Sequence, residues 1–303
     1  MKTFHIDQFT YPLPEGHRFP IPKYALLRQR VQREFVPPCE LAVPEAATID
    51  QLCLIHDAAY IDKVTNGTLS QREVRRIGFP WSPQLVERSR RSVGSTIAAC
   101  RAALDAPVNG STGVAVSLTG GTHHAFADHG EGFCVFNDVA VAARVVQSER
   151  RAEHVVIIDC DVHQGNGTAA LLAADPTVFT FSIHGAKNFP FHKEQSDLDV
   201  ELPDGTGDAA YLAALEDALD YVLPAAQADL AMYLAGADPY EGDTLGRLAL
   251  SKAGLAARDR LVFDRCRHWR LPVAVVMGGG YARNIEDTVD IQFATVRLAA
   301  ELA

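Results

Sequence analysis

Short apolar runs alternate with helix-length segments along most of this chain, and this alternation constrains the fold more than any other feature. Five runs rich in β-branched residues predict buried strands at Val114–Leu118, Val155–Ile158, Val178–Ile183, Leu230–Ala235 and Val273–Met277. Helix-length segments surround them, at Ser82–Ala106, Asn137–Ser148, Gly167–Ala174, Asp208–Ala226, Lys252–Trp269 and Ile285–Leu302. Strands that are joined through helices run parallel, so the pattern predicts an α/β fold with a parallel sheet covered on both faces.

The length and composition of the chain suit one domain. It has 303 residues, 48% of them hydrophobic, which is enough for a sizeable core. No repeat, low-complexity stretch or linker interrupts the sequence, so we expect residues 1–303 to form a single domain. Residues 1–80 contain many prolines, Pro38 among them, and we expect that part to be rich in loops.

Charge and cysteine content narrow the classes of function. The formal net charge is −10, which disfavours binding to nucleic acid or to anionic membranes. The six cysteines form no CxxC pair, as is typical of reduced thiols in the cytoplasm. The N-terminus has no apolar segment like that of a signal peptide, and no run of about 18 apolar residues occurs. We therefore expect a cytoplasmic protein with no nucleic-acid or membrane partner.

Polar residues follow each predicted strand at its carboxyl end. They are His123 and His124 after the first strand, Asp159, Asp161 and His163 after the second, His184 after the third, Asp238 after the fourth, and Gly278–Tyr281 after the fifth. Any one of these groups could be a helix cap or a hydrogen-bonding group of a loop. Five such clusters at the edge where α/β sheets bind ligands indicate a functional site.

Asp161, His163 and Asp238 are the candidate metal ligands. Asp161 and His163 are two residues apart, so their side chains can point to the same side of an extended backbone. Three protein ligands with one open position are typical of catalytic zinc. Two carboxylates and an imidazole suit Zn²⁺ and also accept Fe²⁺, Co²⁺ or Mn²⁺. Taken alone, Asp238 before Pro239 would more simply be a turn or cap residue.

His123, His124 and Tyr281 are the candidates for proton transfer and charge stabilisation. Adjacent histidines point in different directions, so each ring needs its own partner to fix its tautomer. Asp159 is a candidate partner for one ring and Asn166 for the other. Tyr281 follows three glycines, which permit close backbone approach, so its phenol can donate to a developing oxyanion. The simpler alternative is a tyrosine that packs on the sheet.

Aromatic residues near these groups are candidates for a substrate channel. Gly132 and Phe133 lie just after the histidine pair. Phe189 and Phe191 flank Pro190 and are candidates for the opposite wall. Ordinary core packing is the alternative for each of these phenylalanines.

These residues carry a family likeness: the chain resembles the histone deacetylase superfamily, which includes bacterial deacetylase-like amidohydrolases and acetoin-utilisation proteins. The matching motifs cover most of the chain from about residue 110 onward, in family order. They are GGTHHA at 120–125, GFCVFND at 132–138, DCDVHQGNG at 159–167, GADP at 236–239 and GGGY at 278–281. The segment 13–20 and the Gln164–Asn166 variant are most similar to the class IV branch and its bacterial relatives.

The resemblance implies an arginase-deacetylase fold, with a central parallel sheet of about eight strands and helices on both faces. It also implies an amidohydrolase in which Zn²⁺ is held by Asp161, His163 and Asp238. Water on that metal would attack the amide carbonyl of an acylated lysine in a protein or peptide.

The resemblance assigns further roles around the metal. His124 would be the general base and then the general acid, with Asn166 as its partner. His123 would be its electrostatic partner and would pair with Asp159. Tyr281 would stabilise the tetrahedral oxyanion.

The resemblance also implies binding residues around these groups. Gly132 and Phe133 would border the acyl-lysine tunnel, and we place Phe191 and Gly279 in the same substrate site. Family members can also hold a monovalent cation, K⁺ or Na⁺. The residues expected near that ion are Asp159, Asp161, His163 and Ser182.

The chain departs from the family pattern in two places. Asn166 replaces the Asp of some classes and adds no negative charge, so we hypothesise that His124 is a weaker base than its Asp-paired counterparts. In addition, residues 62–83 offer no clear match to the rim Asp that grips the substrate backbone in class I enzymes.

Other functions are alternatives to the hydrolysis of acyl-lysine. A deacetylase of small acylated amines such as acetylpolyamines is the nearest, and a narrow acidic mouth would favour it. A long-chain deacylase is another. A binding module without catalysis is disfavoured because all the motif residues are intact, and an arginase-like ureohydrolase would need a two-metal cluster with more carboxylates.

Overall fold

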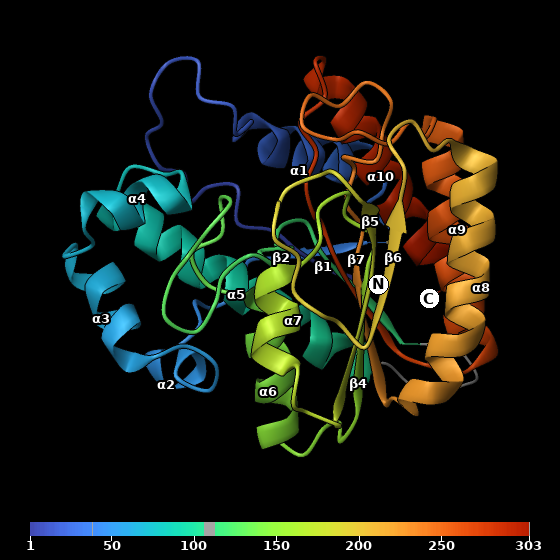
Figure 1. The fold of residues 1–303 in the computed structure, drawn as a ribbon, viewed down its shortest axis with the longest axis horizontal. Helices are drawn as coiled ribbons and strands as arrows, with labels where there is room; N and C mark the ends of the chain where they lie inside the picture. Colours follow the sequence, from blue (N-terminus) through green and yellow to red (C-terminus); the bar gives the residue numbers. More distant parts are fainter. Residues whose placement is uncertain (38, 106–112, 303) are drawn as a thin grey trace.

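The computed structural model, shown in Figure 1, describes residues 1–37, 39–105 and 113–302. Its centre is a sheet of eight parallel strands in the order β2-β1-β3-β8-β7-β4-β5-β6. The strands are β1 (Lys2–Phe4), β2 (Glu40–Ala42), β3 (Val114–Ser117), β4 (Val155–Asp159), β5 (Val178–Gly185), β6 (Leu198–Leu202), β7 (Leu230–Leu234) and β8 (Val273–Val276). The predicted α/β class and the eight-stranded parallel sheet are confirmed.

Helices cover both faces of this sheet. They are α1 (Pro22–Glu34), α2 (Ile49–Leu52), α3 (Ala58–Asn66), α4 (Gln71–Ile77), α5 (Pro83–Leu104), α6 (Asp138–Ser148), α7 (Asn166–Leu172), α8 (Asp208–Ala226), α9 (Lys252–His268) and α10 (Ile285–Leu302). Figure 1 shows α8 and α9 on one side of the sheet and α5, α6 and α7 on the other, with α2–α4 beyond α5. The predicted strands and helices after residue 80 are all present, with ends shifted by at most two residues, and Ala106 and Pro38 lie outside the described residues.

Successive residues of the central strands contribute to cores on opposite faces. In β4, Val155 and Ile157 belong to the apolar cluster on the α5–α6 side. Val156 and Ile158 belong to the cluster that also contains residues of α8, α9 and α10. Because side chains alternate along a strand, a strand covered on both faces is apolar at successive positions, as β4 is from Val155 to Ile158 before it ends at Asp159.

The expectation of a loop-rich segment over residues 1–80 is wrong for much of its length, since it contains β1, β2 and α1–α4. Pro22 stands in the first turn of α1, where its missing N–H costs nothing. Capping boxes begin α2 at Thr48 and α4 at Ser70. The two strands have three residues each, which is too short for a periodic pattern.

The parallel arrangement brings the strand ends to one edge. Asp159 at the end of β4 is level with Ser182 on β5 and with Leu234 on β7. Val276 on β8 is level with both Leu234 and Ser117. The loops that follow these strands therefore start side by side. Within the described residues, no helix combines the length and the apolar character needed to span a membrane.

Candidate active site

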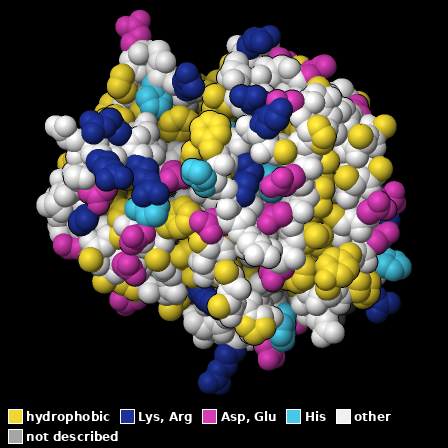
Figure 2. Space-filling view, viewed as in Figure 1, with side chains coloured by type: hydrophobic (Ala, Val, Ile, Leu, Met, Phe, Trp, Pro, Cys, Tyr) yellow, Lys and Arg dark blue, Asp and Glu magenta, His cyan; other side chains and the backbone are white. Residues whose placement is uncertain are grey.

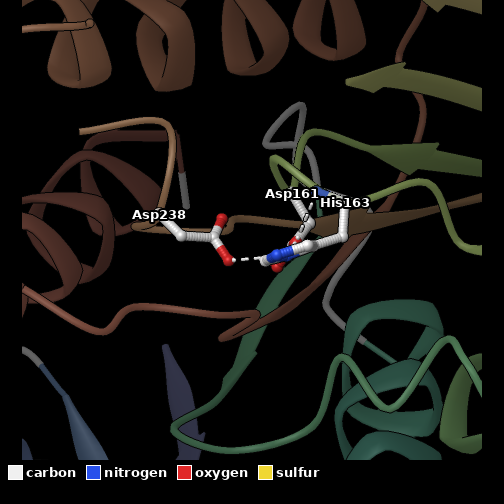
Figure 3. Close-up of side chains that lie close together, drawn as sticks. All are labelled: Asp161, His163 and Asp238. Atoms are coloured by element: carbon white, nitrogen blue, oxygen red, sulfur yellow. Dashed lines mark hydrogen bonds and ion pairs between the residues drawn. The ribbon is translucent and has the colours of Figure 1, made fainter. Parts of the chain in front are cut away.

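Three buried side chains converge where β4 and β7 end (Figure 3). Asp161 and His163 follow β4, and Asp238 follows β7. His163 Nδ1 lies 2.9 Å from Asp161 Oδ1 and 3.2 Å from Asp238 Oδ2. One candidate ligand atom from each residue lies within 4.8 Å of the others. The predicted metal ligands thus meet at one point, although they come from two separate loops.

The donor set fits a divalent cation. Asp238 Oδ2 is buried and forms no hydrogen bond with the described residues, although the His163 ring lies at ion-pair distance, and this arrangement is costly unless another group supplies the contact. Its other oxygen, Oδ1, accepts from the N–H of Val162 at 2.9 Å. A Cβ on Gly279 would lie 1.8 Å from Asp238 Oδ2, so the backbone approaches the triad as closely as only glycine allows.

The electrostatics of the triad also favour a cation. Burial, together with the neighbouring carboxylate of Asp161, raises the pKa of Asp238 to about 7. Burial alone would lower the pKa of His163, but the hydrogen bond with Asp161 and the negative charges of Asp161 and Asp238 outweigh it and raise that pKa to about 10. Two carboxylates therefore compete for one proton-bearing imidazole at a buried site. A divalent ion with oxygen and nitrogen ligands would replace that proton.

The adjacent histidines take two different partners. The Nδ1–H of His123 donates to Asp159 Oδ2 at 2.6 Å, and the Nδ1–H of His124 donates to Asn166 Oδ1 at 2.7 Å. The structure therefore brings together both predicted pairs. With each Nδ1 used in this way, each Nε2 is left for another partner.

The two rings differ in charge. Burial disfavours the charged form of His123, but the carboxylates of Asp159 and Asp161 prevail and raise its pKa to about 9. Burial, and then the positive charges of His123 and His163, hold the pKa of His124 well below its usual range. His124 is therefore the neutral ring that can accept a proton, and His123 is the charged one.

Glu131 was not expected at the site. The amide of Asn166 donates from Nδ2 to Glu131 Oε1 at 3.2 Å, and Arg76 Nε donates to Glu131 Oε2 at 2.7 Å. An ionised carboxylate only accepts hydrogen bonds, so Glu131 fixes which end of the Asn166 amide faces His124. No periodicity or spacing in the sequence links residues 131 and 166.

Tyr281 is held by its backbone. Its N–H donates to Asp243 Oδ2 at 2.6 Å, and its carbonyl accepts from the Thr244 hydroxyl at 2.8 Å. Lys23 Nζ, which is buried, lies 5.2 Å from the centre of the ring. Burial, and then the carboxylates of Asp238 and Asp161, raise the pKa of Tyr281 well above its usual range. The phenol therefore stays protonated and available as a donor.

Two further buried residues support the loop that carries the histidines. Asp138 accepts from the N–H of Thr122 at 2.7 Å and from that of Gly121 at 3.1 Å. Asn137 donates from Nδ2 to the Ala125 carbonyl at 3.2 Å. Both residues belong to the GFCVFND motif, so the sequence could have marked them as candidate site residues. The motif alone does not say what they contact.

A pocket of about 520 Å³ leads to these groups. The rings of Phe133 and Phe189 line it, and a Cβ on Gly132 would lie 2.8 Å from the His124 ring and 3.0 Å from the Phe189 ring. Gly132 therefore keeps the passage open. Phe191 also lines the pocket, but its 82% exposed side chain belongs to the mouth rather than to the interior. Gly279 lies at the inner end, where its N–H donates to Asp161 Oδ2 at 2.6 Å.

The residues expected at a monovalent cation lie where β4 and β5 end, and two of them, Asp161 and His163, also belong to the triad. Asp159 and Ser182 are register partners on β4 and β5, and Asp159 Oδ1 accepts from the Asp161 N–H at 3.1 Å. The Ser182 hydroxyl lies 2.9 Å from His184 Nδ1. Burial lowers the pKa of His184 to about 4, so this strand-end histidine is neutral and serves as a partner of Ser182.

Comparison with known proteins agrees with this geometry. The family model described as "Histone deacetylase domain" matches residues 17–295. An uncharacterized protein of Picosynechococcus is 44% identical over 287 residues, which cover 94% of this chain and 93% of that protein. Histone deacetylase 2 of Arabidopsis thaliana is 33% identical over 260 residues, with 81% of this chain and 65% of that protein covered.

Solved structures show the same fold. An HDAC homolog from Aquifex aeolicus superposes with a TM-score of 0.84 at 23% identity, covering 99% of this chain and 84% of that chain. The HD domain of HDA15 gives a TM-score of 0.82 at 21% identity, with 99% and 91% covered. The eight-stranded parallel sheet with helices on both faces is therefore the arginase-deacetylase fold. With the family model matched over most of its length, the chain belongs to the histone deacetylase family, and by that membership it is a hydrolytic deacetylase.

Proposed function

We propose that this protein hydrolyses the amide of acylated lysine side chains in proteins or peptides with metal-activated water. The observation that carries the proposal is that a neutral His124, the phenol of Tyr281 and two of the triad residues, Asp161 and His163, line a single pocket. Base, oxyanion donor and metal ligands are the parts that such a reaction needs within reach of one carbonyl.

Asp161, His163 and Asp238 would hold the metal, for which we propose Zn²⁺, with Fe²⁺ or Co²⁺ as alternatives. Such an ion, when bound, polarises the substrate carbonyl and lowers the pKa of a water molecule towards neutrality.

The side chains around the triad carry the proton and the developing charge. His124 Nε2 takes the proton of the attacking water and passes it to the departing lysine amine, a role worth roughly 10²–10⁴-fold in rate. Asn166 keeps the other proton of that ring on Nδ1. His123, charged and paired with Asp159, stabilises negative charge nearby. The Tyr281 hydroxyl donates to the oxyanion, which is worth about 10²–10³-fold.

The pocket suits the long apolar stem of lysine. Phe133 and Phe189 supply apolar walls for its methylene groups, and Gly132 leaves room beside the base. Gly279 at the inner end and Phe191 at the mouth complete the binding residues that we propose.

Five further features belong to this proposal. The chain acts as one catalytic domain over residues 1–303, and it is closest to the class IV branch of the family. It acts in the cytoplasm and binds neither nucleic acid nor membrane. It holds K⁺ or Na⁺ through oxygen atoms, with Asp159, Asp161, His163 and Ser182 as the residues around the ion.

The test is hydrolysis by the zinc-loaded protein. Acetyl-lysine and longer acyl-lysine peptides are assayed with and without a chelator, alongside acetylpolyamines. We expect turnover that the chelator abolishes and added Zn²⁺ restores. Asp161→Ala and Tyr281→Phe should lose activity, whereas Tyr221→Phe, at an exposed position on α8 outside the pocket, should not. The absence of turnover with every acyl-lysine peptide would refute the proposal.

A further inference from the structure

The exposed charged side chains that line the mouth of the pocket are all positive. Three exposed charged side chains line it: Arg18 before α1, Lys187 after β5 and Arg247 in the loop between β7 and α9. Among the described residues that line the pocket, the only carboxylate is that of Asp161, which is buried in the metal triad. The mouth is therefore basic, whereas a mouth suited to cationic amines would be acidic.

This local charge opposes the balance of the whole chain. The sequence holds 38 acidic residues against 28 basic ones. Figure 2 shows acidic and basic side chains interspersed over the visible face, so the net negative charge does not make the surface uniformly acidic. A substrate near the mouth is within a Debye length of the rim cations, and their local field acts on it more strongly than distant charges do.

Two of these cations have no partner of opposite charge. Neither Arg18 nor Lys187 forms an ion pair with any residue in the part of the chain that the structure describes. Arg247 Nη1 lies 3.2 Å from Asp204 Oδ2, but both side chains are largely open to solvent, so that pair is weak and leaves the guanidinium accessible.

The rim is also held in place. Asn188, next to Lys187, is buried; it donates from Nδ2 to the Leu245 carbonyl at 2.8 Å and accepts the Arg247 N–H at 3.2 Å. Gln164, one residue after the candidate ligand His163, forms two hydrogen bonds with the backbone of Glu194, farther along the loop that carries Lys187. The loops that carry Lys187 and Arg247 are thus tied to one another and to the end of β4. Pre-organised charges of this kind select among partners.

We propose that the mouth selects acyl-lysine that is flanked by aspartate or glutamate, so that substrate carboxylates meet Arg18, Lys187 and Arg247 while the acyl-lysine enters the pocket. This inference rests on the proposed acyl-lysine hydrolysis and specifies its substrates. Cationic acylated amines, such as acetylpolyamines, are poor substrates because the same charges repel them.

The experiment compares three acetyl-lysine peptides of equal length with acidic, neutral or basic flanking residues, together with an acetylated diamine. The zinc-loaded protein is assayed for kcat/KM at low and high salt. Exposed charge pairs are worth up to about 1 kcal/mol each, so we expect the acidic peptide to exceed the basic one by roughly 10-fold or more at low salt. The difference should shrink at high salt because the rim is exposed.

Charge reversal tests the residues themselves. Arg18→Glu combined with Lys187→Glu should reverse the order of the acidic and basic peptides. A control with the same change in net charge combines Lys2→Glu and Arg297→Glu, at exposed positions that do not line the pocket, and should keep the original order.

Each outcome decides the inference. Equal kcat/KM for the three peptides, faster hydrolysis of the diamine, or the same order in the rim variant as in the control would overturn it and leave acyl-lysine hydrolysis intact. No turnover of any peptide would overturn the proposed function and this inference with it. Preference for the acidic peptide that is reversed only in the rim variant supports it.

Discussion

The contact between Asn166 and Glu131 predicts a strong coupling between two mutations. Asn166 accepts from His124 with one end of its amide and donates to Glu131 with the other, over 3.2 Å. Asn166→Asp replaces the donor by a second carboxylate, which then faces Glu131 at about the distance of the present hydrogen bond. The substitution should therefore be much more harmful beside Glu131 than in a protein that also carries Glu131→Gln.

The size of the coupling follows from the geometry. Two like charges at about 4 Å repel by about 1 kcal/mol in bulk water and about 4 kcal/mol at an effective dielectric constant of 20. The Glu131 side chain is only 16% exposed, which strengthens the repulsion relative to bulk water, but its pair with Arg76 partly neutralises its charge and weakens it. We expect about 1–2 kcal/mol, or roughly a 5- to 30-fold change in kcat/KM.

The assay is the pH dependence of kcat/KM for the wild type, the two single variants and the double variant. Asn166→Asp should lose activity, and Glu131→Gln should restore part of it when combined with Asn166→Asp. Extra negative charge beside His124 stabilises its protonated form, so Asn166→Asp should also raise the lower apparent pKa of the profile. Glu149→Gln is the matched control. Glu149 is a partly exposed glutamate just after α6, and it pairs with Arg101 of α5. Losses that multiply independently, within about twofold, would refute the argument from Glu131.

Three further predictions concern the metal site. Gly279→Ala should abolish metal binding, measured by metal content after dialysis, because its Cβ would lie 1.8 Å from Asp238 Oδ2; retained stoichiometric metal would contradict this. Chelation should lower the thermal midpoint, and metal at 100 times its Kd should stabilise the protein by about 2.7 kcal/mol, as measured by unfolding with and without Zn²⁺. Since the pKa of metal-free His163 is about 10, the ion must displace a proton, so affinity should fall as pH is lowered and binding should release protons in calorimetry; a pH-independent affinity would be inconsistent with this.

Most of the helices and strands after residue 80 could be predicted from short stretches of the sequence. The runs that form β4, β7 and β8 are apolar at nearly every position because both faces of each strand are covered, and that pattern is readable from a few neighbouring residues. The edge strands β2 and β6, and β1 beside β2, were not predicted. They are short, and β6 alternates polar and apolar residues only over Leu198–Leu202, which is too little to separate a strand from a loop.

The sequence by itself determined which groups the site could use. Asp161 and His163 are two residues apart, and wherever the backbone is extended that spacing puts both side chains on the same side, whatever the rest of the chain does. The pairing of His123 with Asp159 and of His124 with Asn166 could likewise be proposed, because each candidate partner lies in a quoted motif.

Only the tertiary structure decided which distant residues surround these groups. Glu131 reaches Asn166 across 35 positions, Lys23 reaches the loop of Tyr281 across 257, and the rim cations come from three separate loops. Loop side chains have no periodicity that records their neighbours, since their positions depend on how helices and strands far along the chain pack together. The basic mouth is therefore a property of the folded molecule, and it is opposite in sign to the net charge that composition alone reports.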